Sequence, residues 1–181
     1  MKVGLFFGTF DPLHNGHIGI CKELFEKKIM DEIWLIITPH SPHKKSEQIA
    51  DKYLRLDMIK EAINQFKFIK ALDIEFKMEK PNFTFLTLKE IKKKFPSNNY
   101  SIIMGEDNFL TIDTWKNSTY IKSNFKIISY PRSSESLDDV FDNFYDVSST
   151  EIRHSVKNRN DISQFVPKEV YRFIKERNLY I

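Results

Sequence analysis

Short apolar segments alternate with amphipathic segments along the chain, and this alternation limits the fold more than any other feature. Apolar runs with the length and composition of buried strands span residues 2–7, 33–37, 69–76, 100–104, 125–130 and 144–147. Helical spacing of apolar residues predicts helices over 16–25, 51–66, 84–95, 150–157 and 167–177. Such an alternation predicts an α/β fold with a doubly wound, mostly parallel sheet flanked by helices.

Length and charge narrow the class of protein further. The 181 residues are enough for one domain with a sizeable core, so we expect a single Rossmann-like domain spanning residues 1–181. The net charge of +3 arises from mixed charges, which argues against a nucleic-acid partner and suits small anionic ligands.

The expected location is the cytoplasm. Cys21 is the only cysteine, so an internal disulfide is excluded and a reducing compartment is favoured. We find no signal peptide at the N-terminus and no segment long enough to span a membrane, so we expect no membrane partner. The sequence is compatible with a monomer and with a homo-oligomer.

The first apolar run leads into a segment typical of a phosphate-binding turn, Gly-Thr-Phe-Asp-Pro-Leu-His-Asn-Gly-His over residues 8–17. Gly8 permits a bend, and the Asp11-Pro12 pair favours a turn. His14 and His17 then fall at the start of the next helix, where free N–H groups and the helix dipole attract anions. Gly16 has no Cβ, so a phosphate is expected to approach its backbone.

Candidate ligand-binding residues also follow the later strands. In a doubly wound sheet, ligands bind beyond the carboxyl ends of the strands, where the strand order reverses. The residues in question are Lys44 in the 39–45 loop, Phe83, Thr84, Gly105, Asp107, Arg132, Ser149, Thr150 and Arg153. We expect them to gather with His14 and His17 at one edge of the sheet.

Five segments in register resemble the bacterial nicotinate-nucleotide adenylyltransferases of the HxGH nucleotidyltransferase superfamily. They are the segment 8–17, Pro42-His43-Lys44, Gly105-Glu106-Asp107, Trp115, and Ser-Ser-Thr-Glu-Ile-Arg over 148–153. The resemblance covers nearly the whole chain. Phe7 departs from it, since the family usually has glycine there. We expect Phe7 either to change the backbone contact with the ligand or to turn into the core. The 39–44 loop is also shorter than the common form.

The resemblance implies transfer of AMP from ATP to nicotinate mononucleotide, which yields deamido-NAD and pyrophosphate in NAD biosynthesis. The attacking phosphate is mostly dianionic at neutral pH and needs no strong general base. Catalysis then depends on positioning and on charge stabilisation. Mg²⁺ is expected on the phosphates, held by substrate oxygens and water rather than by protein side chains.

The resemblance also implies roles for individual residues. The catalytic set is Thr9, His14, His17, Lys44 and Arg153, with His17 at the α-phosphate and with Lys44 and Arg153 neutralising the β- and γ-phosphates. The ATP-binding set is Gly8, Thr9, His17, Gly105, Asp107, Ser149, Thr150 and Arg153, with Asp107 at the ribose. Ser149 and Thr150 are expected to cap the helix that they open. The nicotinate-nucleotide set is Phe83, Thr84, Trp115 and Arg132.

Other interpretations stay open at this point. A nicotinamide mononucleotide or phosphopantetheine adenylyltransferase of the same superfamily is the nearest alternative, and a non-catalytic nucleotide-binding module is a more distant one. A zinc site is a rival for the histidines, because His14-x-x-His17, His40-x-x-His43 and Cys21 have spacings typical of ligands.

Overall fold

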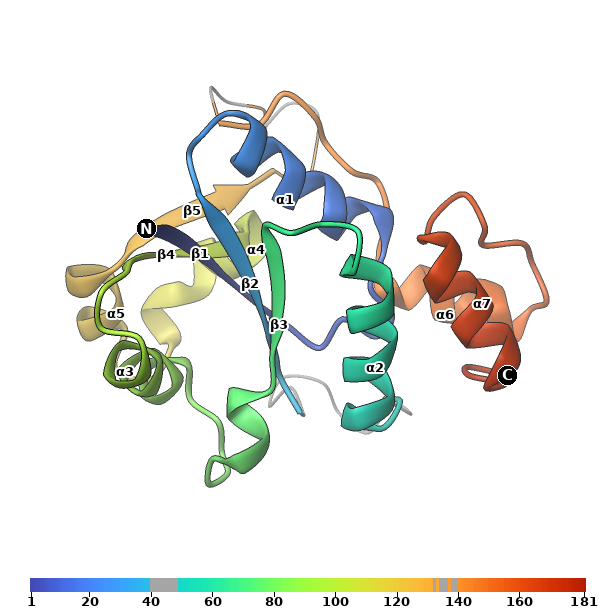
Figure 1. Ribbon diagram of the computed structural model, residues 1–181, viewed down its shortest axis with the longest axis horizontal. Coiled ribbons are helices and arrows are strands. Elements are labelled where there is room, and N and C mark those ends of the chain that lie inside the picture. Colours follow the sequence, from blue (N-terminus) through green and yellow to red (C-terminus); the bar gives the residue numbers. More distant parts are fainter. Residues whose placement is uncertain (40–48, 132, 134–136, 138–139) are drawn as a thin grey trace.

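The described residues form one parallel sheet with five strands in the order β3-β2-β1-β4-β5 (Figure 1). The structure is a computed structural model and describes residues 1–39, 49–131, 133, 137 and 140–181. The strands are β1 (Lys2–Gly8), β2 (Glu32–Ile37), β3 (Ile69–Leu72), β4 (Asn99–Gly105) and β5 (Lys126–Tyr130). The order reverses between β1 and β4, so the carboxyl ends of these two strands flank the expected ligand site.

Helices cover both faces of this sheet (Figure 1). They are α1 (Asn15–Glu26), α2 (Lys52–Ile63), α3 (Thr84–Lys94), α4 (Glu106–Thr111), α5 (Ser118–Asn124), α6 (Ser149–Lys157) and α7 (Lys168–Glu176), with the 3₁₀ turns η1 (Ile74–Lys77) and η2 (Ile112–Thr114). The apolar cluster on one face includes residues of α1, α2, α6 and α7, and the cluster on the other includes residues of α3 and α5. The expected doubly wound α/β fold is therefore confirmed.

The alternation of side chains along the inner strands explains why these strands are apolar throughout. Leu5 of β1 and Ile36 of β2 belong to the cluster under α3, whereas Phe6 and Leu35 belong to the cluster under α1 and α2. Successive strand residues point to opposite faces, so a strand covered on both faces buries all of them. Phe7 packs against the α3-side cluster, which matches the second of its two expected outcomes.

Two predicted strands are corrected by the structure. The third ends at Leu72, and the remainder of the run turns into η1. The segment 144–147 is not a strand but packs along α1, where Glu23 accepts hydrogen bonds from the Asp142 N–H (2.8 Å) and the Tyr145 hydroxyl (2.7 Å). A Cβ on Gly19 would lie 2.2 Å from Cζ of Tyr145, so the ring requires glycine there. These side-chain contacts override the strand propensity of the run.

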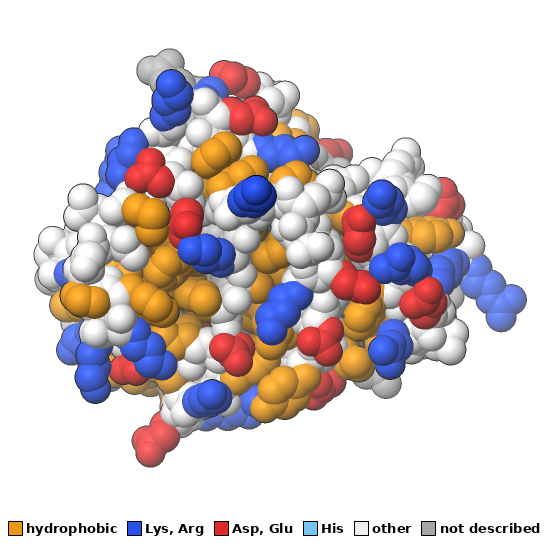
Figure 2. All heavy atoms as spheres, in the orientation of Figure 1, with side chains coloured by type: hydrophobic (Ala, Val, Ile, Leu, Met, Phe, Trp, Pro, Cys, Tyr) orange, Lys and Arg blue, Asp and Glu red, His pale blue; other side chains and the backbone are white. Residues whose placement is uncertain are grey.

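The surface is mixed in charge on the face that Figure 2 shows, where acidic and basic side chains are interspersed around apolar ones. Helices α4 and α5, which follow β4, were not predicted from the sequence, because they have only 6 and 7 residues and are too short to show a helical period. Among the described residues, no helix combines the length and apolar character needed to cross a membrane.

Candidate functional site

The turn after β1 bends at Phe10, whose φ of 48° lies in the left-handed region. The expectation that Gly8 supplies the bend was wrong, because no described glycine has a positive φ. Gly8 instead provides space: a Cβ there would lie 3.0 Å from the Phe10 ring. That ring is 2% exposed and packs edge-on against Phe6 and His17, with centroids 5.6 and 5.0 Å away. The sharp turn is therefore stabilised by aromatic packing below it.

The two histidines of the first motif lie against each other at the start of α1. His14 is the N-cap residue, and its backbone N–H donates to Nδ1 of His17 at 3.2 Å. Their rings are stacked, with centroids 3.6 Å apart. Because Nδ1 of His17 accepts a hydrogen bond, its neutral ring carries the proton on Nε2. His17 is thus prepared as a donor through Nε2.

Gly16 provides space for packing. A Cβ on this buried residue would lie 2.9 Å from Cγ1 of Val147 and 3.1 Å from Cβ of Tyr145. The absence of a side chain therefore lets the 145–147 segment pack against α1.

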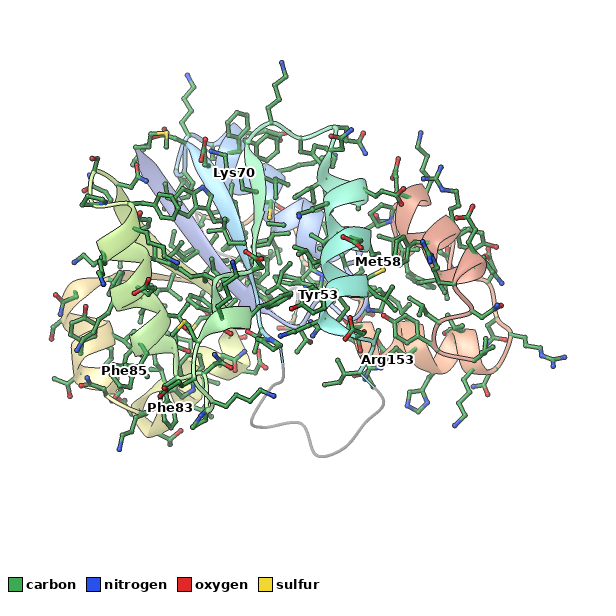
Figure 3. All side chains as sticks on the ribbon, turned by 60° about the horizontal axis from the view of Figure 1, so that its bottom comes forward. Tyr53, Met58, Lys70, Phe83, Phe85 and Arg153 are labelled. Atoms are coloured by element: carbon green, nitrogen blue, oxygen red, sulfur yellow. The ribbon has the colours of Figure 1, made fainter. Side chains whose placement is uncertain are left out.

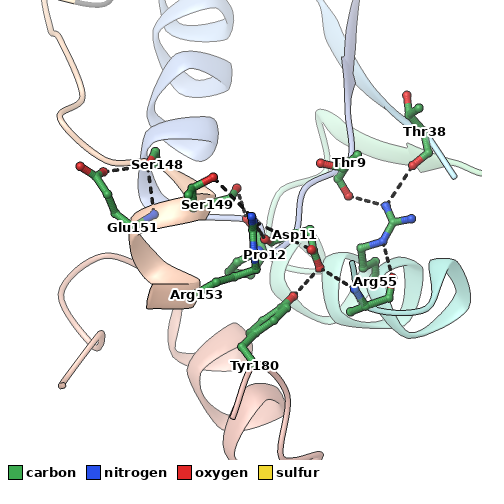
Figure 4. A network of polar contacts seen from close by, with 12 residues as sticks. Thr9, Asp11, Pro12, Thr38, Arg55, Ser148, Ser149, Glu151, Arg153 and Tyr180 are labelled. Atoms are coloured by element: carbon green, nitrogen blue, oxygen red, sulfur yellow. Dashed lines mark hydrogen bonds and ion pairs between the residues drawn. The ribbon is translucent and has the colours of Figure 1, made fainter. Parts of the chain in front are cut away.

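Helix α6 meets the turn through two predicted residues, Ser149 and Arg153 (Figure 4). The Ser149 hydroxyl donates to the Pro12 carbonyl at 2.9 Å, and Nη1 of Arg153 donates to the Asp11 carbonyl at 2.8 Å. Nη2 of Arg153 donates to the Thr150 hydroxyl at 3.3 Å. The first and last motifs, more than 130 residues apart in sequence, are therefore in direct contact.

The cap of α6 also differs from expectation. Ser148, not Ser149 or Thr150, is the N-cap, and its hydroxyl oxygen accepts from the Glu151 N–H at 3.2 Å. Ser149 and Thr150 use their hydroxyls in the contacts with the turn and with Arg153. A capping hydroxyl must come from the residue before the first helical turn, and Ser148 occupies that position.

Arg55 was not among the predicted residues, yet it holds the edge of the sheet together. This side chain on α2 is 1% exposed and donates to the carbonyls of Thr9 and Thr38 (3.1 Å), as Figure 4 shows. It also donates to the carbonyls of Pro39 (2.8 Å) and Ala50 (2.9 Å). It thus joins the ends of β1 and β2 to the start of α2. The sequence pattern could have indicated that Arg55 is buried, because it lies three residues before Met58 and seven before Ala62, on the inward face of the helix.

The residues predicted to bind nicotinate lie on the side of the sheet that α3 covers. Phe83 is the N-cap residue of α3, and Thr84 is its first residue. The Phe83 and Phe85 rings are stacked, with centroids 6.2 Å apart. Trp115, after η2, is half-buried and packs against the α3-side cluster. Phe83 and Arg153 lie well apart in the view of Figure 3, with Phe83 at the lower left and Arg153 right of the centre.

A buried carboxyl group underlies this aromatic side. Glu75 is 3% exposed, and its Oε1 accepts from the Thr87 hydroxyl of α3 at 2.8 Å. The Glu75 carbonyl accepts from the Asn82 side chain at 3.2 Å, which ties η1 to the segment before Phe83. Burial raises the pKa of Glu75 to about 7, and the hydroxyls of Thr87 and Thr38 lower it in part.

Gly105 and Asp107 follow β4 as predicted, with Gly105 buried at the N-cap of α4 and Asp107 exposed in its first turn. The predicted residues Lys44 and Arg132 lie outside the described residues, as do His40 and His43. Within the described ranges, no group of three or more His, Cys, Asp or Glu side chains is placed to hold a metal ion. Burial raises the pKa of the Cys21 thiol, which disfavours the thiolate that a metal requires.

Comparison with known protein families gives a consistent result. The family model described as "Cytidylyltransferase-like" matches residues 5–155. A probable nicotinate-nucleotide adenylyltransferase from Flavobacterium psychrophilum is 39% identical over 191 residues, covering 99% of each chain. One from Christiangramia forsetii is 40% identical over 192 residues, covering 99% of this chain and 98% of the relative.

Solved structures extend the similarity to the fold. The Plasmodium falciparum nicotinic acid mononucleotide adenylyltransferase complexed with NaAD superposes with a TM-score of 0.80 at 20% identity. The comparison covers 99% of this chain and 97% of that one. The same protein complexed with APC gives a TM-score of 0.78. At this level of identity, the match establishes a shared fold.

Proposed function

Since the chain belongs to the nicotinate-nucleotide adenylyltransferase family, we propose that it transfers AMP from ATP to nicotinate mononucleotide. The products are deamido-NAD and pyrophosphate. One observation carries the proposal to this chain's own residues: Ser149 and Arg153 of α6 contact the backbone of the turn that leads into His14 and His17. Groups suited to a polyphosphate thereby converge on the edge of the sheet where the strand order reverses.

The reaction is a displacement at phosphorus. A phosphate oxygen of nicotinate mononucleotide attacks the α-phosphorus of ATP, and a new P–O bond forms. The bond from the α-phosphorus to the oxygen that bridges to the β-phosphate breaks, and pyrophosphate leaves with the electron pair. Both the nucleophile and the leaving group are anions that are stable near neutral pH, so no protein base is needed. The protein's task is to align two polyanions and to stabilise negative charge.

His17 and Arg153 supply the charge stabilisation in this mechanism. The hydrogen bond from His14 fixes the His17 ring with Nε2 as the donor, which suits an α-phosphate oxygen. Arg153, whose side chain is 11% exposed, faces the turn from α6 and neutralises the β- and γ-phosphates. Thr9 directly follows β1, and Arg55 fixes its carbonyl, so its backbone has a defined position.

Mg²⁺ fits this arrangement as a cation held by the substrate. Asp11 has the carboxylate nearest to Arg153 in the turn, but Oδ1 already accepts from Tyr180 and Ala50. The metal would therefore be held mainly by phosphate oxygens and water, and it would reduce the charge of the triphosphate.

The pyridine side of the site is formed by Phe83, Thr84 and Trp115 in this proposal. The aromatic rings of Phe83 and Trp115 suit a planar base, and the first N–H groups of α3, which begins at Thr84, suit the carboxylate that distinguishes nicotinate from nicotinamide. The enzyme is proposed to act in the cytoplasm on small nucleotides, which agrees with a buried free cysteine.

Pyrophosphate release tests the proposal directly. Purified protein with ATP and Mg²⁺ is assayed against nicotinate mononucleotide, nicotinamide mononucleotide and phosphopantetheine in parallel. We expect the highest kcat/KM with nicotinate mononucleotide, and formation of deamido-NAD checked by chromatography. Preference for the amide or for phosphopantetheine would overturn the substrate assignment, and no turnover with any of the three would overturn the activity.

A further inference from the structure

The C-terminal end of the sequence lies directly beside the turn of the first motif. The Tyr180 hydroxyl donates to Oδ1 of Asp11 at 2.6 Å, across 169 positions of sequence (Figure 4). Tyr180 adopts a left-handed backbone (φ 64°), and its ring packs with Leu179 against the apolar cluster under α1 and α2. A backbone conformation of this kind carries a cost for a non-glycine residue, so the surrounding contacts must hold it in place.

Asp11 is the residue through which this contact reaches the candidate site. It is 1% exposed, and its Oδ1 also accepts from the Ala50 N–H at 3.3 Å. Its carbonyl accepts from Nη1 of Arg153, and its Oδ2 lies 4.0 Å from the same nitrogen. Asp11 therefore contacts Arg153 through both its backbone and its charge, while Tyr180 holds its other carboxylate oxygen.

The protonation states suit this arrangement. Burial raises the pKa of Tyr180, and the charge and hydrogen bond of Asp11 raise it further, so the hydroxyl keeps its proton and remains a donor. Burial also raises the pKa of Asp11, whereas the Tyr180 hydrogen bond and the charges of Arg153 and Arg55 favour its ionised form. An ionised Asp11 thus accepts from the Tyr180 hydroxyl through one oxygen and attracts the Arg153 guanidinium through the other.

We propose that Tyr180 is a positioning residue for ATP: by binding Oδ1 of Asp11, it keeps this carboxylate from pairing fully with Arg153. Without the hydroxyl, the longer bond from Ala50 is the one that Oδ1 keeps among the described residues, and the carboxylate turns toward the guanidinium 4.0 Å away. A closer ion pair neutralises Arg153 and weakens its attraction for the β- and γ-phosphates. The inference rests on the proposed use of Arg153, but it does not require turnover to be tested.

The test compares the affinities of ATP and AMP for the wild type and for Y180F, measured by calorimetry with the full chain. AMP lacks the β- and γ-phosphates, so only ATP reports on Arg153. We expect Y180F to weaken ATP binding about tenfold, because a hydrogen bond to a charged group contributes on this scale, and to leave AMP binding within twofold. Y171F is the matched control, since it removes a hydroxyl from α7 that is not a partner of Asp11 among the described residues.

A second variant separates positioning from simple destabilisation. D11N keeps the side-chain oxygen that accepts from Tyr180 but removes the charge that competes for Arg153, so Y180F/D11N should recover at least half of the lost ATP affinity on a logarithmic scale. Equal weakening of ATP and AMP in Y180F, no weakening of either, or no recovery in the double variant would each overturn the proposal. If ATP binds as expected but no pyrophosphate is released with any acceptor, the proposed function fails and the role of Tyr180 is still decided.

Discussion

The two sides of the candidate site are built by different physical means. On the phosphate side, charged and polar side chains fix backbone carbonyls of the turn and its neighbours: Arg55, Arg153 and Ser149 together bond to those of Thr9, Asp11, Pro12, Thr38, Pro39 and Ala50. On the pyridine side, Phe83 lies at the start of α3 and Trp115 at the end of η2. The polar pair of this side is buried and consists of Glu75 and Thr87. A polyanion needs fixed donors and charges, whereas a planar ring needs apolar surface, so the comparison predicts separable effects of mutation.

The largest effect is expected from the removal of the His17 donor. H17A should lower kcat by about 10³-fold, because a fixed donor at the α-phosphate acts on the charge that develops in the transition state. The measurement is pyrophosphate release at saturating substrates, with circular dichroism to show that the fold persists. H154A is the control, because His154 is an exposed histidine of α6 outside the first motif. Activity of H17A within a few-fold of the wild type would contradict the role given to His17.

The next largest effect is expected from the loss of Arg153, and it tests whether the two sides of the site act separately. R153A should lower kcat/KM for ATP by about 10²-fold, since a charged donor to the triphosphate is lost. The KM for nicotinate mononucleotide should change little, because Phe83 lies well apart from Arg153 (Figure 3). K157A, one turn later on α6, is the matched control. An equal loss of kcat/KM for the two substrates would contradict the separation of the site into two sides.

The sheet and its long helices could be predicted because their signals are local. β1, β2 and β4 are apolar runs of strand length, and α3 was predicted within one residue. The segment 144–147 has the same composition as a strand, but Glu23 and Gly19 hold it along α1. That competition depends on residues more than 120 positions away, which no local pattern contains.

The candidate site was only partly visible in the sequence for a similar reason. The histidines and Arg153 stand in recognisable motifs, so their order along the chain identified them. The role of Gly8 was wrongly predicted, because the atoms that require glycine there belong to Phe10, and the packing of Gly16 against Val147 was not predicted at all. Arg55 stands in no motif, and its function depends on four carbonyls that only the fold brings together.

The buried carboxyl of the pyridine side predicts a pH-dependent stability. The pKa of Glu75 rises from 4.5 to about 7 on folding, so its contribution to stability is fully present below pH 4.5 and is lost as the pH rises through 7. Between pH 5 and 8, the free energy of unfolding of the wild type should fall by about 2 kcal/mol relative to that of E75Q, which cannot ionise. Urea unfolding at both pH values measures the difference.

The exposed Glu79 provides the control for that measurement, because E79Q should follow the wild type at both pH values. A stability difference between E75Q and the wild type that is independent of pH would show that Glu75 is ionised throughout the range. The buried pair of Glu75 and Thr87 would then contain a charged group, as the contacts of the phosphate side do. The two sides would differ less than proposed.

The smallest effect is expected at Trp115 and concerns the pyridine ring alone. W115A should raise the KM for nicotinate mononucleotide about tenfold, since loss of one stacking side chain costs about 1–3 kcal/mol, while the KM for ATP stays within twofold. W115F keeps an aromatic face and should stay within threefold of the wild type for both substrates. Trp115 also packs against the α3-side cluster, so a thermal melt must accompany the kinetics. A parallel rise in both KM values would mean that Trp115 stabilises the fold and does not contact the pyridine ring.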